Sequence, residues 1–166
     1  MPTALEKYED YVLNNPVGER IVEVIEISHP DIEPIYLARE PESLTVTLED
    51  NSIVQTKGVN MVISRASSED DLDEKFAFDI EDIYGEAQDI LSNIEVNDNT
   101  SLNIIYRLYM ASDLTEISIG PYVLQVTNIS FTKGRFSMQA ESPSLVRSRT
   151  GELYTYDRFP MLRAFL

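Results

Sequence analysis

The sequence predicts a mainly β protein: an antiparallel β-sandwich or barrel with one amphipathic helix and a short N-terminal helix. Several runs of β-branched and aromatic residues alternate apolar and polar positions, which is the period of a half-buried strand. Turn residues separate these runs at short intervals. The regular strand–helix alternation of a parallel sheet is absent. With 166 residues, of which 43% are hydrophobic, the chain is long enough to bury a core.

Two segments show helical periodicity. Residues 4–14 place apolar side chains, Leu5 and Val12 among them, at helical spacing, and the Asn-Asn-Pro that follows is a stop signal. In residues 79–94 apolar side chains recur every three or four positions, and Asp79 is placed to cap the N-terminus. We therefore expect a short N-terminal helix and one longer amphipathic helix.

The remaining periodic segments predict strands. The strand at 101–110 places alternate apolar side chains on one face and Arg107 and Tyr109 on the other. In 122–131 the inward register shifts near Thr127, which predicts a β-bulge. The expected strands are residues 19–28, 34–38, 43–48, two within 52–64, 75–80, 101–110, 122–131 and 135–140.

Two Lys-Gly pairs mark tight turns in the sequence. The pair at 133–134 joins the last two strands. The pair at 57–58 predicts that residues 52–64 fold as a β-hairpin.

Composition excludes several classes of function. A net charge of −16 argues against nucleic-acid binding, which depends on neutralised phosphates. The absence of cysteine excludes disulfides and thiolate metal sites. No apolar run approaches the roughly 18 residues of a membrane span. The first residues lack the basic start and apolar middle of a signal peptide. We expect a protein made and assembled in a cytoplasm, with no membrane span and no nucleic-acid partner.

The charge is unevenly distributed along the chain. After residue 130 there are six basic and three acidic residues, a local charge of +3, so the first 130 residues carry −19. An acidic surface keeps a protein soluble. The alternative is that a basic edge of one copy meets an acidic face of the next, and such head-to-tail contacts can close into rings. We therefore divide the chain into a β-rich domain, residues 1–142 with its helix at 79–94, and an extended docking arm, residues 143–166.

No residue pattern predicts catalysis, cofactor binding or a metal site. His29 is the only histidine, and beside a proline in a turn it is typical of a structural hydrogen-bonding group. No nucleophile-elbow motif accompanies it, and one histidine without cysteine cannot supply a zinc site. The acidic residues of 67–74 leave open a Ca²⁺ site, although the spacing of an EF-hand is missing. The absence of tryptophan weakens glycosidase and lectin hypotheses.

Tyrosine, arginine and large apolar residues form the candidate interface. These residue types bury a large area yet keep a polar group, and they are enriched where proteins meet. The alternative is that they cover the domain's own core. The candidates are Arg107, Tyr109, Arg147, Arg149, Tyr154, Tyr156, Arg158, Phe159 and Leu162.

Three short motifs occur in a specific order: IEISHP at 25–30, YRLYMASDL at 106–114 and YTYDRFPML at 154–162. In this order the chain resembles, from about Leu5 to Leu162, a tailed-phage family known only as a domain of unknown function and encoded among minor tail genes. The resemblance implies a structural virion protein of the tail tip, baseplate hub or distal tail. It implies no chemistry.

From that resemblance we expect a three- or six-fold ring of identical copies that joins the tail tube to the hub and fibres. The expected partners are the copies themselves and the tail tube, tape-measure and hub or fibre proteins. Two alternatives stay open: a receptor- or glycan-binding module of the tail tip, and a tail assembly chaperone that leaves before maturation. An enzyme is disfavoured.

Overall fold

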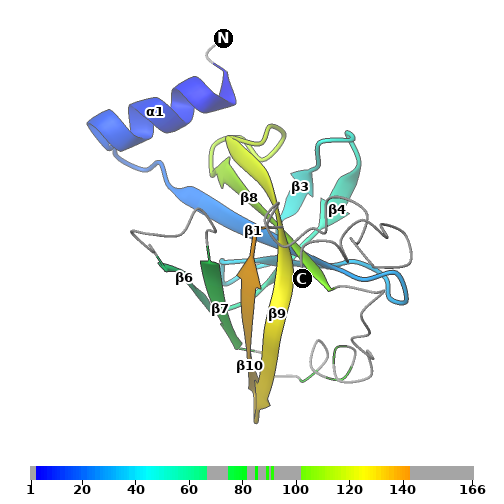
Figure 1. Ribbon diagram of the computed structural model, residues 1–166. Coiled ribbons are helices and arrows are strands. Elements are labelled where there is room, and N and C mark those ends of the chain that lie inside the picture. The colour runs from blue at the N-terminus through cyan, green and yellow to red at the C-terminus, as the bar shows by residue number, and fades with distance from the viewer. Residues whose placement is uncertain are drawn as a thin grey trace, which may run out of the picture.

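The computed structural model describes residues 3–66, 75–81, 85, 89, 91 and 102–142. This part of the chain is mainly β, as the sequence predicts: a curled eight-stranded sheet, a small two-stranded sheet and an 11-residue helix (Figure 1). The elements in order are α1 (Ala4–Asn14), β1 (Ile21–Ser28), β2 (Ile35–Ala38), β3 (Thr45–Thr47), β4 (Ile53–Gln55), β5 (Lys57–Gly58), β6 (Met61–Ala66), β7 (Lys75–Glu81), β8 (Asn103–Met110), β9 (Ile119–Thr132) and β10 (Arg135–Glu141).

The large sheet has the strand order β5-β2-β1-β8-β9-β10-β7-β6, and only the β2–β5 pair is parallel. Because β5 and β6 are consecutive in sequence but lie at opposite ends of this order, the sheet must curl. Val59 N–H donates to the Ala38 carbonyl of β2 at 2.9 Å, and the Asn60 carbonyl accepts from Glu81 N–H of β7 at 2.9 Å. The two ends of the sheet meet at this corner and form a half-barrel.

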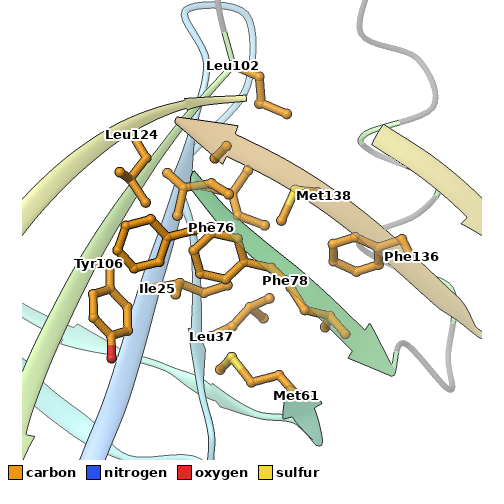
Figure 2. Close-up of a cluster of buried hydrophobic side chains, with 14 of the residues drawn as sticks. Ile25, Leu37, Met61, Phe76, Phe78, Leu102, Tyr106, Leu124, Phe136 and Met138 are labelled. Carbon is orange, nitrogen blue, oxygen red and sulfur yellow. The ribbon is translucent and has the colours of Figure 1, made fainter. Parts of the chain in front are cut away.

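The main core fills the inside of the curl. Alternate side chains of β7, β8 and β10 point inward and converge with those of β1 and β2 (Figure 2). The inward positions predicted from period-two alternation are confirmed on these strands. The buried members of this cluster are Ile25, Ile27, Leu37, Met61, Phe76, Phe78, Ile80, Leu91, Leu102, Ile104, Tyr106, Leu108, Leu124, Phe136, Met138 and Ala140.

A second, smaller core lies on the outer face of β1, β2 and β8. The antiparallel sheet of β3 and β4 packs against this face through Val46, which is buried with Val22 and Val24 of β1. Leu44 and Leu48 flank Val46 on the same side, as their alternation predicts. The middle of β1 is therefore buried on both faces.

The predicted bulge in β9 is confirmed. Gln139 of β10 pairs with Asn128, whereas the next residue, Ala140, pairs with Val126, so Thr127 is the extra residue. Its hydroxyl donates to the Gln139 carbonyl at 3.2 Å. The bulge moves the inward register from Leu124 to the later residues of the strand and lets a 14-residue strand follow the curl.

The predicted hairpin at 52–64 is wrong. The segment contributes three strands with three different partners: β4 pairs with β3, β5 with β2, and β6 with β7. The Lys57-Gly58 pair does not turn the chain back but forms β5 itself. Gly58 is needed there because the backbone carbonyls of Glu40 and Glu42 lie close to it. A local turn signal does not distinguish a glycine in a tight turn from a glycine beside a neighbouring backbone.

The N-terminal helix is confirmed, while the start of the helix predicted at 79–94 is wrong. Asp79 and Glu81 belong to β7, where Asp79 pairs with Ser137 of β10 and accepts its hydroxyl hydrogen bond. Further along, Asp89 N–H donates to the Gly85 carbonyl at 2.8 Å, which is the spacing of an α-helix. The rest of that predicted helix, and the predicted arm at 143–166, lie outside the described residues.

Replacing Gly58 by alanine is expected to lower the free energy of unfolding by about 1–3 kcal/mol, the range for overpacking. An added Cβ would lie 2.5 Å from the Glu42 carbonyl oxygen and 2.6 Å from that of Glu40. Urea denaturation measures the effect. Gln55→Ala, at an exposed neighbouring strand position, is the control and should change stability by less than about 0.5 kcal/mol. Equal stability of the Gly58→Ala and parent chains would contradict the close approach.

Candidate assembly surfaces

A buried ion-pair cluster joins the two sheets. Arg107 of β8 points to the outer face of the large sheet, and its side chain is 1% exposed. Its Nε and Nη2 donate to the two carboxylate oxygens of Glu49 at 2.8 and 2.7 Å. Its Nη1 forms an ion pair with Oε2 of Glu26 on β1 at 2.8 Å. The fork geometry of guanidinium fits a carboxylate through two bonds at once, so Arg107 clamps the β3–β4 turn onto β1 and β8.

The pKa values follow from this packing. The hydrogen bond from Arg107 lowers the pKa of Glu49 below its ordinary value. Tyr109, two residues along the same face of β8, is fully buried, and burial raises its pKa to about 12. Its hydroxyl donates to the Thr47 carbonyl on β3 at 2.8 Å. Both side chains are occupied in holding β3 and the following turn.

Arg107 and Tyr109 are therefore buried inside the chain, whereas the predicted interface role places them at its surface. They lie on the face of β8 that the sequence predicts, but the β3–β4 sheet covers that face and buries both side chains within the chain. The alternative, that they cover the chain's own core, describes them better. The other candidates, Arg147, Arg149, Tyr154, Tyr156, Arg158, Phe159 and Leu162, lie outside the described residues.

His29 is a structural group in the turn after β1. It is 5% exposed, and its Nδ1 accepts a hydrogen bond from Asp31 N–H at 3.2 Å. Its Nε2 is buried and has no hydrogen-bond partner among the described residues. In the same part of the chain no group of three or more histidine, cysteine, aspartate or glutamate side chains is placed to hold a metal ion. The acidic segment 67–74 lies outside the described residues.

Sequence analysis missed an exposed apolar surface on α1. In Figure 1 the helix stands off from the sheet at the start of β1. Ala4 is buried and Tyr8 packs against the main core, whereas Leu5, Val12 and Leu13 are 53%, 60% and 80% exposed. Apolar spacing identified the helix but not which of its sides packs on the sheet. The adjacent apolar residues Ala4 and Leu5 could have indicated an exposed apolar side chain, because two adjacent positions of a helix cannot both face the sheet fully.

The helix is capped and anchored by polar contacts. Thr3 and Glu6 form a capping box, in which each side chain accepts from the other residue's backbone N–H. On the side that faces the sheet, Lys7 Nζ donates to Asp113 Oδ2, after β8, at 2.6 Å. That hydrogen bond from Lys7 lowers the pKa of Asp113 to about 2, and the same bond raises the pKa of Lys7.

The Asp113 contribution to stability is expected to depend on pH in a defined direction. Its pKa is lowered on folding, so its contribution is complete above the ordinary value of 3.8 and disappears as the pH falls to about 2. Asp113→Asn should therefore be less stable than the parent at neutral pH, and the difference should vanish across this acid range. Urea denaturation at a series of pH values measures it. A difference that persists unchanged at the lowest pH would contradict the assignment.

Among the described residues, no helix is long and apolar enough to cross a membrane. Residues 10–149 match the family model described as "Domain of unknown function (DUF1833)". The chain belongs to this family. The DUF1833 match includes the ten strands of the described residues, the Arg107 cluster and the second half of α1. A search of curated proteins found no match. The described residues within 10–149 thus show the fold of a DUF1833 member.

Proposed function

We propose that this DUF1833 protein is a structural component of a bacteriophage tail tip or baseplate. Its copies form a three- or six-fold ring that joins the tail tube to the hub and fibres. The observation that carries the proposal is the helix α1, which is anchored to the sheet by one side and leaves Leu5, Val12 and Leu13 exposed on another. Exposed apolar residues grouped on one side of a helix are typical of surfaces that other proteins cover.

The sequence resemblance supplies the setting for this proposal. Two of its three motifs have structural roles: residues 25–30 end the doubly buried strand β1, and residues 106–114 contain the clamp Arg107, Tyr109 and the Lys7 partner Asp113. The resemblance therefore reaches the residues that organise the fold. The proposed partners are further copies and the tail tube, tape-measure and hub or fibre proteins.

Two measurements test this function. Mass spectrometry of purified particles, made by the genome that encodes this chain, should detect the protein in mature virions. Light scattering should find three or six copies in the purified oligomer. The proposal would be overturned if the protein were absent from virions and a strain lacking its gene still built complete tails. Presence in tail intermediates alone would instead identify an assembly chaperone.

One observation favours a second candidate, a glycan-binding module. Tyr122 of β9 is 41% exposed, and its ring stacks on Tyr106 with the centroids 6.4 Å apart. The Tyr106 hydroxyl donates to Glu23 at 2.8 Å, and Glu23 accepts from Arg39 at 2.7 Å. An aromatic ring beside charged hydrogen-bonding groups is the chemistry of sugar recognition. A glycan that binds the parent chain but not Tyr122→Ala would support this candidate, and absence of binding across a glycan array would remove it.

A further inference from the structure

We propose that the exposed side of α1 is the docking site for residues 143–166 of a neighbouring copy. This inference rests on the proposed assembly function and names the contact that holds the copies together. We call Leu5, Val12 and Leu13 the α1 patch; their side chains are 53%, 60% and 80% exposed. Each copy would offer one patch and one segment.

The geometry of α1 separates a packed side from an open side. Leu5 and Val12 are seven residues apart, two helical turns, and so lie on the same side, with Leu13 beside Val12. The packed side carries Ala4, which is buried, and Lys7, which is anchored to Asp113. Since the anchored side fixes the helix on the sheet, the patch is held in a defined orientation toward solvent.

The charge around the patch selects its occupant. Glu9 and Asp10 are exposed on the same helix, and the charge of Lys7 is already paired with Asp113. The patch is therefore apolar within an acidic surface. Residues 143–166 have the complementary composition, with four arginines against two acidic residues and with large apolar side chains between them. Complementary charge of this kind steers association and sets its orientation.

The sheet register places the start of segment 143–166 far from α1 of the same chain. β10 ends at Glu141, which pairs with Gln125 of β9; Gln125 pairs with Asn103 at the start of β8, and Asn103 with Ser28 at the end of β1. The helix α1 instead leads into the start of β1. Segment 143–166 therefore begins at the end of the sheet remote from α1. A head-to-tail arrangement of copies brings the remote end of one beside the helix of the next, and such contacts build closed rings.

Photo-cross-linking of the full chain tests the contact. A benzoylphenylalanine at position 13, which is 80% exposed in the parent, is placed in copies of normal isotopic mass and mixed with ¹⁵N-labelled copies. Cross-linked peptides that pair position 13 with residues 143–166 of the other isotopic mass are expected. Cross-links confined to one mass would show that the chain covers its own helix. Cross-links between two α1 helices, or none, would also overturn the proposal.

Matched variants of the full chain give an independent measurement. Leu5→Ser/Val12→Ser/Leu13→Ser should weaken self-association about tenfold or more in analytical ultracentrifugation, as for the loss of interface anchors. Ile53→Ser/Val62→Ser changes exposed apolar residues elsewhere (73% and 54%) and should leave association unchanged. Raised salt should weaken the parent oligomer, because it screens the arginine–carboxylate attraction. Equal association of both variants would overturn the proposal.

The outcomes separate this inference from the proposed function. If the protein associates through the α1 patch but is absent from virions, the contact is supported and the tail-tip role is overturned. If the protein is present in virions but its position 13 cross-links to a different tail protein, the tail-tip role is supported and the contact between copies is overturned.

Discussion

Replacing Arg107 by methionine is expected to lower the free energy of unfolding by about 3 kcal/mol or more. Methionine fills much of the same space but leaves the Glu26 carboxylate, whose side chain is 11% exposed, without its positive partner. A buried charge without a partner lowers the free energy of unfolding by much more than the intact pair raises it. Glu49 is 43% exposed and regains water, so the expected loss comes mainly from Glu26. Urea denaturation of the purified variant measures the change.

A surface arginine provides the matched control. Arg39 is 51% exposed and pairs with Glu23 at 2.7 Å, nearly the distance of the Arg107 contacts. Arg39→Met should cost less than about 1 kcal/mol, because solvent weakens exposed pairs. Adding Glu26→Gln to Arg107→Met should recover part of the stability, since the orphaned charge is removed. Equal losses for the two single variants would show that the clamp is no stronger than a surface pair.

Replacing Phe78 by alanine is expected to lower the free energy of unfolding by about 3–5 kcal/mol, the range for a buried phenylalanine. Phe78 is fully buried at the centre of the main core (Figure 2). Its neighbours across the sheet are Ile63 of β6 and Met138 of β10, and its ring stacks on Phe76 with the centroids 6.1 Å apart. A cavity at this position removes contacts from both neighbouring strands.

Two substitutions calibrate this result. Phe78→Leu keeps most of the apolar volume and should cost clearly less than Phe78→Ala. Val123→Ala, on an exposed part of β9, should change stability by less than about 0.5 kcal/mol. Thermal and urea denaturation give both values. If Phe78→Ala and Val123→Ala were equally stable, Phe78 would not lie in a close-packed core.

These stability effects must be kept apart from the effects on assembly. Arg107 and Phe78 are buried within the chain, so losing either one reduces the folded population and with it any oligomer. Leu13 is exposed, so its replacement should reduce association while the denaturation midpoint of the monomer stays unchanged. Measuring both quantities on each variant distinguishes a folding residue from a contact residue.

The local sequence pattern predicted burial and strand register correctly where the environment of a residue follows from its neighbours in sequence. The alternation of Phe76, Phe78 and Ile80 predicted their burial, and the slip at Thr127 predicted the bulge. Ile80 shows the limit, because it fits both the strand period before it and the helical period after it. The strand continues through Glu81 because β10 supplies a pairing partner for each residue of β7.

The sequence by itself determined the mainly β class, the helix α1 and the face of the sheet to which each side chain of β7, β8 and β10 points. These depend on backbone periodicity, which is local. Only the tertiary structure decided what covers each face: the β3–β4 sheet buries Arg107 and Tyr109, and nothing among the described residues buries Leu13. The pairing of β5 with β2, and the resulting curl, were decided in the same way. Contacts between segments distant in sequence depend on how whole elements pack, and no local period encodes that packing.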